Sequence, residues 1–459
     1  MSITNPITVT DVPIPFLAWL GAQLVKAEGG QSEVRLDVLP QHCNSWHVCH
    51  GGVLMTMLDA AMATAARSLH PELRGSATVD MTTSFVRPGE AGTLVAYGKC
   101  YHRSSTMAFC EAKAAGWWPV PAARSSTSRS AATRASMAEL RHPRPLDPQV
   151  ADLVSRVQRA HRPPYWHYTP QQARAIHEKA SKVLEIAAVE VAELRDLDIP
   201  VGDGATIGAR LYTGMQAPDP APLVIFSHGG GFTIGSVRDY DAVCRMLANG
   251  VRCKVLSLDY RLAPEHRFPT AANDVYAAWR WAFERHAMLG IDPTRVAGMG
   301  DSAGGTLTAQ AALRARDDGL ALAAQVLLYP GTSAWQDTAS HRAYATGYLL
   351  DERTIQWFFN QYLRDDADRL DWRFAVLDAP EFVGLAPAFL QLAECDPLVD
   401  EGLAYGHKLE AARVPVRIQV YQGAIHSFYN MGGALRVARQ AHRDSVDYLR
   451  AVFETSNAA

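Results

Sequence analysis

The second half of the chain alternates short apolar runs with longer amphipathic segments. The apolar runs are residues 223–227, 254–259, 296–299, 325–329, 388–393 and 416–421. Apolar runs of this length predict buried strands, and strands separated by helices predict a mostly parallel sheet. Two further segments, 194–200 and 205–212, predict antiparallel edge strands. We therefore expect an α/β architecture with helices on both faces of the sheet.

The first part of the chain has a different pattern. Residues 53–69 form a continuous apolar stretch that predicts a helix, interrupted by Asp59. Residues 33–39 alternate as a strand does, and residues 78–86 and 93–113 predict long strands. A helix that is apolar all round is normally central and buried, and an acid inside it needs a partner or a chemical role.

Between these two parts, residues 114–134 do not continue the strand pattern. The segment contains two prolines, many small residues and a run of Ser, Thr and Arg. Such a composition is typical of a linker. We expect a first domain over residues 1–135, a linker over 136–147 and a second domain over 148–459.

The segment 114–134 also suggests a hypothesis about the origin of the gene. Tryptophan has a single codon, so a reading frame shifted back by one base turns Trp118-Pro119 into Val-Ala. The flanking codons can then spell an alternating strand. A frameshift that scrambled this strand and fused two reading frames, with Met137 as the earlier start of the second, would explain the pattern. A natural linker is the alternative.

Composition narrows the classes of function. The apolar fraction of 48% and the charged fraction of 20% are ordinary for globular proteins. A net charge of -3 favours neither nucleic acid nor an anionic membrane as a partner. No apolar run reaches the ~18 residues that a membrane span needs, and the polar N-terminus does not resemble a signal peptide. Seven cysteines at irregular spacing favour reduced thiols and a cytoplasmic location.

Ser302 stands between two glycines, Gly300 and Gly304, where a predicted strand meets a predicted helix at residues 306–316. A sharp strand-to-helix turn of this kind is the nucleophile elbow, which exposes a strained serine above a helix N-terminus. On its own the motif is weak, because an ordinary glycine turn has the same pattern.

Further motifs along the chain support the interpretation of Ser302 as a nucleophile. In order along the chain they are HGGGF at 228–232, DYRLAPEH at 259–266, GDSAGG at 300–305, DPLVD at 396–400 and a histidine at 426. Together they resemble the hormone-sensitive-lipase family of α/β hydrolases. The resemblance implies an α/β-hydrolase fold with a helical cap and a serine carboxylesterase acting on short- to medium-chain esters. It also implies an acyl-enzyme, and neither a metal nor another cofactor.

Each part of that chemistry has a candidate residue. Ser302 is the expected nucleophile and His426 the base, and Asp396 is the acid that orients the imidazole, with Asp400 as its rival. The expected oxyanion donors are the backbone amides of Ala303, Gly230 and Gly231, with Gly229 as an alternative.

Two other histidines stand inside these motifs. We expect His228 to orient the glycine loop and His266 to be structural. The expected cap is formed by residues 148–190, with helices at 148–160 and 170–190, and by residues 335–380. The second segment is rich in aromatic residues, most of them expected in the core and some in the acyl pocket.

The first domain carries a second resemblance. Asn44, His50-Gly51-Gly52 and Asp59 are similar to the asparagine, H-G-G and helix acid of hotdog-fold acyl-CoA thioesterases of the phenylacetyl-CoA-pathway type. The expected fold is an α+β hotdog, with amides at the helix start polarising a thioester and Asp59 as base or nucleophile. His47 departs from that pattern, which usually has glycine there, so the alternative is that Asp59 is a paired structural acid.

Three interpretations of this domain can be compared. His42, Cys43, His47, Cys49 and His50 could be metal ligands, but their spacing matches no standard zinc pattern, so we expect no metal. The domain could be an active acyl-CoA thioesterase, which would make the chain bifunctional. We favour the third interpretation, in which it serves mainly to hold a homo-oligomer together, because one sheet edge is expected to be open.

Overall fold

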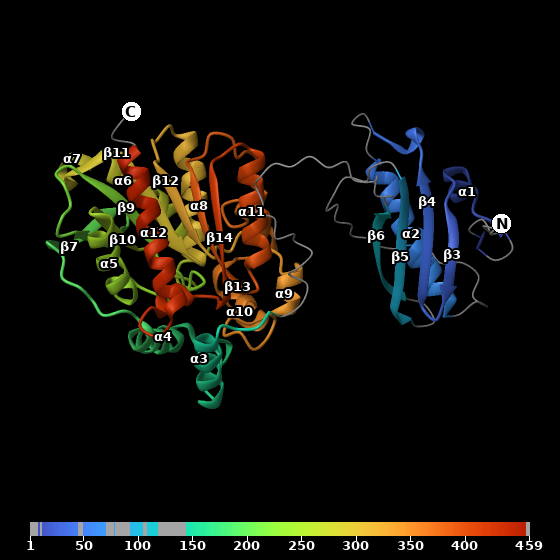
Figure 1. Ribbon diagram of the computed structural model, residues 1–459, viewed down its shortest axis with the longest axis horizontal. Helices are drawn as coiled ribbons and strands as arrows, with labels where there is room; N and C mark the ends of the chain where they lie inside the picture. Colours follow the sequence, from blue (N-terminus) through green and yellow to red (C-terminus); the bar gives the residue numbers. More distant parts are fainter. Residues whose placement is uncertain are drawn as a thin grey trace, which may run out of the picture. The chain divides into compact units, whose positions relative to one another are not determined.

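The computed structural model describes residues 8–9, 12–44, 49–69, 78, 92–103, 108–117 and 144–455. The chain divides into two compact units, Met1–Ala132 and Thr133–Ala459, which are described separately (Figure 1). The linker residues 136–143 and the segment 118–134 lie outside the described residues, as does His47.

The first unit is built on an antiparallel sheet with the strand order β3-β4-β5-β6. Its strands are β3 (Gln23–Glu28), β4 (Gln31–Val38), β5 (Gly92–Arg103) and β6 (Ala108–Trp117). One long helix, α2 (Gly51–Ser68), packs against β4, β5 and β6. The smaller elements are β1 (Thr8–Val9), β2 (Val12–Pro13), α1 (Pro15–Leu20) and η1 (Pro40–His42).

Helix α2 approaches the sheet closely at Gly98. A Cβ added to Gly98 would lie 2.3 Å from the carbonyl oxygen of Ala61, so a larger residue would push the helix away. The hydroxyl of Ser32 on β4 donates to the same carbonyl at 2.6 Å. Met57 and Ala61 are fully buried in this contact, and the predicted arrangement of a central helix on an antiparallel sheet is confirmed.

Two details of the first unit differ from the sequence prediction. The segment 93–113 is not one strand but two, β5 and β6, paired antiparallel with Cys100 opposite Cys110. A run of that length exceeds the usual strand of 3–10 residues. Strand β6 also continues past Lys113 to Trp117, which pairs with Thr93, because the ladder joins backbone groups whatever side chains they carry. The predicted strand 78–86 lies outside the described residues apart from Thr78.

The second unit contains an eight-stranded sheet in the order β14-β13-β12-β11-β9-β10-β8-β7. Its strands are β7 (Glu193–Pro200), β8 (Thr206–Thr213), β9 (Ala221–Ser227), β10 (Lys254–Asp259), β11 (Ile291–Asp301), β12 (Ala324–Leu328), β13 (Ala388–Cys395) and β14 (Val416–Ile425). Strands β7 and β8 are antiparallel to their neighbours and the others are parallel. The predicted mostly parallel sheet with two antiparallel strands is confirmed.

Helices cover both faces of this sheet (Figure 1). The α-helices of the unit are α3 (Pro148–Arg159), α4 (Pro170–Leu184), α5 (Asp241–Val251), α6 (Thr270–Glu284), α7 (His286–Leu289), α8 (Ala303–Asp317), α9 (Ala339–Ala343), α10 (Glu352–Tyr362), α11 (Val399–Ala411) and α12 (Arg436–Thr455). Short 3-10 turns are η3 (Tyr165–His167), η4 (Val237–Tyr240), η5 (Asp366–Leu370), η6 (Val376–Asp378) and η7 (Phe428–Met431).

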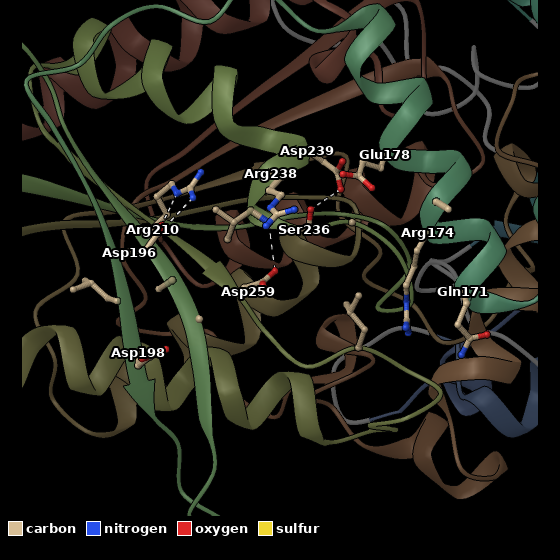
Figure 2. A pocket seen from close by; sticks show the side chains of 17 residues that line it. Gln171, Arg174, Glu178, Asp196, Asp198, Arg210, Ser236, Arg238, Asp239 and Asp259 are labelled. Atoms are coloured by element: carbon tan, nitrogen blue, oxygen red, sulfur yellow. Dashed lines mark hydrogen bonds and ion pairs between the residues drawn. The ribbon is translucent and has the colours of Figure 1, made fainter.

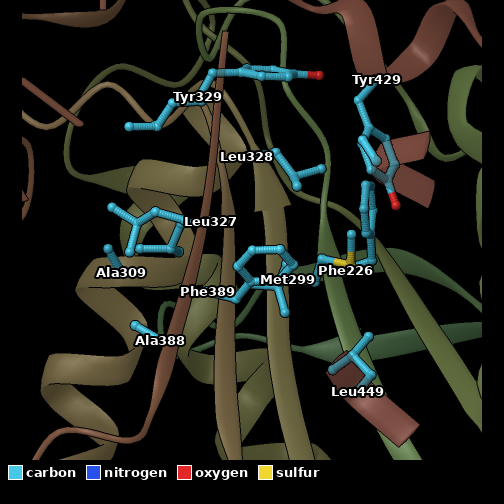
Figure 3. Close-up of a cluster of buried hydrophobic side chains, with 14 of the residues drawn as sticks. Phe226, Met299, Ala309, Leu327, Leu328, Tyr329, Ala388, Phe389, Tyr429 and Leu449 are labelled. Atoms are coloured by element: carbon cyan, nitrogen blue, oxygen red, sulfur yellow. The ribbon is translucent and has the colours of Figure 1, made fainter. Parts of the chain in front are cut away.

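Alternate residues of the central strands enter two different cores. Phe226 of β9 and Met299 of β11 belong to one core together with Leu449 of α12 (Figure 3). Ile225 and Val296, on the same two strands, belong to the other core with α6 and α8. The period of two along a strand therefore explains why these runs are apolar throughout, since both faces of the sheet are buried.

Helix α4 is shorter than predicted. It ends at Leu184 instead of continuing to residue 190, although the residues beyond it favour helix. The amide of Gly433 donates to the carbonyl of Leu184 at 3.0 Å, and a Cβ on Gly433 would lie 2.3 Å from the carbonyl oxygen of Glu185. Tertiary contact with this glycine therefore takes precedence over local helix propensity.

Among the described residues, no helix combines the length and the apolar character that crossing a membrane requires.

Candidate active site

Ser302 lies at the turn between β11 and α8 with φ of +52°. A positive φ is strained for a residue with a side chain, and here the strain turns the hydroxyl away from the sheet. Gly304 permits the turn, because a Cβ there would lie 2.0 Å from the carbonyl oxygen of Ser227. The amide of Ser302 donates to the carbonyl of Leu328 at 2.8 Å and ties the turn to β12.

The ends of three strands bring Ser302, His426 and Asp396 together. Nε2 of His426 lies 2.8 Å from Oγ of Ser302, and its Nδ1 lies 2.7 Å from Oδ2 of Asp396. His426 follows β14 directly and Asp396 follows β13. Asp396 is fully buried, and its other oxygen accepts the amide of Leu398 at 2.9 Å. With Nδ1 protonated, Nε2 is free to accept the proton of the serine hydroxyl.

The glycine loop after β9 presents backbone amides toward the same region. Within residues 144–455, the amides of Gly230, Gly231 and Ala303 donate to no protein acceptor. The amide of Gly229 does have partners, because it donates to Oδ1 of Asp301 at 2.7 Å and to the hydroxyl of Tyr240 at 3.1 Å. Gly229 is therefore a structural donor, and the three remaining amides are available to a developing oxyanion.

Asp301 holds this loop in place. Besides the Gly229 amide, its carboxylate accepts hydrogen bonds from the hydroxyl of Tyr240 at 3.1 Å and from the amide side chain of Asn430 at 3.2 Å. The side chain is 1% exposed, and burial raises the pKa of Asp301 to about 6. The three hydrogen-bond donors lower the pKa, but their effect is smaller than that of burial. Sequence reasoning missed this role, although Asp301 stands inside the GDSAGG motif and its position beside the serine was a signal.

The other acidic and histidine residues of these motifs have structural positions outside the Ser302–His426–Asp396 chain. Asp400 accepts the amide of Ser340 at 2.8 Å, and within residues 144–455 it makes no hydrogen bond to His426 or Ser302. His228 is fully buried, its Nδ1 lies 2.8 Å from the carbonyl of Gly229, and its ring stacks on Tyr260 at 4.3 Å. His266 is exposed at the turn before α6.

The two segments predicted to form the cap contact each other beside the glycine loop. The ring of Tyr165 on η3 lies 6.5 Å from that of Trp357 and 6.2 Å from that of Phe358, both on α10. Phe358 also covers Gly231, where a Cβ would lie 2.2 Å from the aromatic ring. Phe358 is therefore an aromatic wall directly beside one of the unpaired amides.

A charged pocket of about 730 Å³ lies apart from these residues, between α4, β7, β8 and η4 (Figure 2). Its lining includes Arg210, which pairs with Asp196 at 2.6 Å, and Arg174, which pairs with Glu265 at 2.6 Å. Its lining carries three arginines and five carboxylates, and it includes neither Ser302 nor His426 nor Asp396. We assign it no chemistry.

The candidates in the first unit lie around the start of α2. Nδ1 of His50 accepts the amide of Gly52 at 3.0 Å, so this amide already has a partner in the described chain. Asp59 is half-buried and accepts a hydrogen bond from the hydroxyl of Thr78. Asn44 is half-buried just before the undescribed residues 45–48. The described residues gather no group of three or more side chains suited to a metal ion.

Comparison with known proteins agrees with this geometry. A family model described as alpha/beta hydrolase fold matches residues 224–430, and one described as thioesterase superfamily matches residues 47–114. An ethyl acetate hydrolase of Pseudomonas putida is 41% identical over 272 residues, which are 58% of this chain and 85% of that relative. An arylesterase of Saccharolobus solfataricus is 36% identical over 299 residues, which are 64% of this chain and 95% of that relative.

Among solved structures, an ester hydrolase from the metagenome of Lake Arreo, complexed with a derivative of bipyridine phosphonate, matches with a TM-score of 0.65. It is 36% identical, and the match covers 67% of this chain and 99% of that one. The chain therefore belongs to the hormone-sensitive-lipase-like serine carboxylesterases of the α/β-hydrolase fold, and a hotdog domain of the thioesterase superfamily precedes its esterase unit.

Proposed function

We propose that the esterase unit hydrolyses carboxylic esters through an acyl-enzyme on Ser302. His426 takes the hydroxyl proton as Oγ attacks the ester carbonyl, and Asp396 stabilises the imidazolium that forms. The proton then passes from Nε2 to the leaving alcohol. A water molecule, deprotonated by the same nitrogen, releases the acid. The observation that carries this proposal is the continuous chain of hydrogen-bond distances, 2.8 Å and 2.7 Å, from Ser302 through His426 to Asp396.

Three amides stabilise the oxyanion that forms in each half of this mechanism. The attack places a negative charge on the carbonyl oxygen, and Gly230, Gly231 and Ala303 are the donors that we assign to it. Ala303 also stands at the first position of α8, where the helix dipole favours negative charge. One such donor is worth about 10²–10³ in kcat in other hydrolases.

The proposed substrates are esters with short to medium acyl chains. Phe358 lies against Gly231 and limits the space on that side of the oxyanion site. The Pseudomonas putida relative is named for ethyl acetate, a small ester, which favours the same size class. We take residues 148–190 and 335–380 as the cap that covers this site, because Tyr165 and Phe358 bring the two segments together beside it.

Steady-state kinetics on p-nitrophenyl esters of increasing chain length test this proposal. We expect Ser302→Ala to remove nearly all turnover, because the three side chains act as a unit. Thr455→Ala, at the exposed end of helix α12, is the matched hydroxyl-removal control and should retain wild-type kcat. If Ser302→Ala keeps more than about a tenth of wild-type kcat, another residue is the nucleophile.

For the hotdog domain we propose that holding copies of the chain together is the main role. Strand β6 stands at the end of the described sheet order, which favours pairing with a second copy. Two features argue against strong thioesterase chemistry: the Gly52 amide is occupied by His50, and Asp59 accepts from Thr78. A thioester carbonyl would have to displace the first of these hydrogen bonds.

Light scattering on the full chain and on a version starting at Met137 tests the assembly role. We expect the shorter protein to be less associated while it keeps esterase activity. If it keeps the full-length assembly state, the proposed role is wrong. An active acyl-CoA thioesterase remains the alternative for this domain, and brisk acyl-CoA cleavage by Ser302→Ala that Asp59→Ala abolishes would establish it.

A further inference from the structure

Cys43 and Cys49 lie opposite each other immediately before helix α2. They form an isolated antiparallel bridge, and both carry free thiols in this structure. The next pair outward is hydrogen-bonded, because the amide of His50 donates to the carbonyl of His42 at 2.8 Å. Bonded and non-bonded pairs alternate along an antiparallel ladder, so Cys43 and Cys49 occupy a non-hydrogen-bonded pair.

This position brings two side chains as close as a sheet allows. In a non-hydrogen-bonded pair the Cα atoms are about 4.5 Å apart and the Cβ atoms about 4.5–5.5 Å apart. Disulfides span Cα separations of about 4.4–6.8 Å, so the backbone is already within the range that a bond needs. A disulfide joins Cβ atoms about 3.5–4.5 Å apart, so the two segments would have to draw slightly closer but not slide along each other.

The thiols themselves are placed for exchange. Sγ of Cys43 lies 3.6 Å from the carbonyl of Leu39, and Sγ of Cys49 lies 3.9 Å from that of His50, so both side chains must rotate away from these carbonyls before the sulfurs can meet. Cys43 is half-buried and Cys49 is 4% exposed. Burial, and to a smaller extent the neighbouring Cys43, raises the pKa of Cys49, so Cys43 is the better first nucleophile.

We propose that Cys43 and Cys49 form a reversible disulfide, which makes the entry to helix α2 a redox modification site. The oxidant is a low-molecular-weight disulfide such as oxidised glutathione. The Cys43 thiolate attacks one sulfur of that disulfide, its S–S bond breaks, and one glutathione thiol leaves. Cys49 then attacks the Cys43 sulfur and releases the second glutathione. Two cysteine protons are lost, and the small disulfide is reduced by two electrons.

The bond has a defined structural consequence. Cys49 precedes His50, which is the N-cap of α2 and accepts the Gly52 amide. Cys43 follows η1, whose last residue, His42, accepts the His50 amide. A disulfide would therefore lock the start of α2 onto η1, in the region where the thioesterase resemblance is concentrated.

The test uses the wild-type chain in buffers of graded reduced and oxidised glutathione, followed by alkylation of the remaining thiols. Trypsin places both cysteines in one peptide, 36–67, which loses two hydrogen atoms when they are joined. Folding aligns the two cysteines, so the native chain should form the disulfide in more reducing buffer than the unfolded chain. We expect the loss of two hydrogen atoms at a ratio of reduced to oxidised glutathione at least ~10-fold higher in the native chain than in guanidinium. Cys43→Ser should leave Cys49 able to form mixed disulfides only.

Two outcomes would overturn the proposal. One is a native chain that needs the same or a more oxidising buffer than the unfolded chain. The other is full alkylation of peptide 36–67 while peptides 100–103 and 104–113 become joined. That result would place the reactive pair at Cys100 and Cys110, which also lie opposite each other, on β5 and β6.

Discussion

Replacing Asp301 by asparagine separates the charge of this buried side chain from its shape. In the folded chain the pKa of Asp301 is about 6, raised mainly by burial from an ordinary value of 3.8. One pKa unit corresponds to about 1.4 kcal/mol, so the ionised form is penalised by about 3 kcal/mol at neutral pH. The asparagine side chain has nearly the same shape and no charge, so the variant avoids this penalty.

The sign of the pH dependence follows from proton binding. Between the unfolded pKa of about 4 and the folded value near 6, the folded wild type binds more protons than the unfolded chain, so its stability falls as pH rises. Asp301→Asn lacks this contribution. The difference in free energy of unfolding, variant minus wild type, should therefore rise by up to about 3 kcal/mol between pH 4 and pH 7.

Urea unfolding followed by circular dichroism, at pH values from 4 to 7, measures this difference. A difference that does not change with pH would refute the reasoning, because it would mean that Asp301 is not a buried, destabilised carboxylate. Asp301→Ala is the contrasting variant. It leaves the Tyr240 hydroxyl without its acceptor, at a cost of ~1–3 kcal/mol, and leaves the Gly229 amide with only its longer hydrogen bond, to Tyr240. We expect it to lower kcat far more than Asp301→Asn, which can still accept from Gly229.

Two further predictions concern the esterase unit. Asp396→Asn should lower kcat by as much as ~10⁴ through the wrong imidazole tautomer. Asp400→Asn, which alters a contact to backbone, should lower it far less, and the reverse order in the same ester assay would exchange their roles. Gly231→Ala should lower kcat by ~10²–10³, because φ is +57° there and the new Cβ would meet the Phe358 ring. If Phe358→Ala in the same chain restores none of this loss, steric contact is not its cause.

The sequence predicted those parts of the fold and site that depend on local pattern. Uniformly apolar runs marked the buried strands, and the glycines flanking Ser302 marked a turn that no larger residue can make. The positions after β13 and β14 placed Asp396 and His426 at the same edge of the sheet, because carboxyl ends of parallel strands meet there.

What the sequence did not predict depends on contacts between distant segments. The end of α4 is set by Gly433, which lies far along the chain from Leu184. The occupied amide of Gly229 is visible only once Asp301 is seen beside it. Strand β3 was missed because four of its six side chains are exposed and the other two are only half-buried, so no alternation of buried and exposed positions marks it. The pattern of residues therefore predicts burial and turns, but it does not predict which polar groups from distant segments form hydrogen bonds with each other.

The most direct test of the proposed mechanism is to locate the covalent intermediate. The wild-type chain is treated with an organophosphate ester that mimics the tetrahedral intermediate, and the adduct is located by tandem mass spectrometry. Trypsin yields the peptide 296–314, which contains Ser302 and the hydroxyls of Thr306 and Thr308. We predict one adduct per chain, on Ser302, lost in Ser302→Ala and much slower to form in His426→Ala. An adduct on another residue, or labelling that survives Ser302→Ala, would contradict the proposed mechanism.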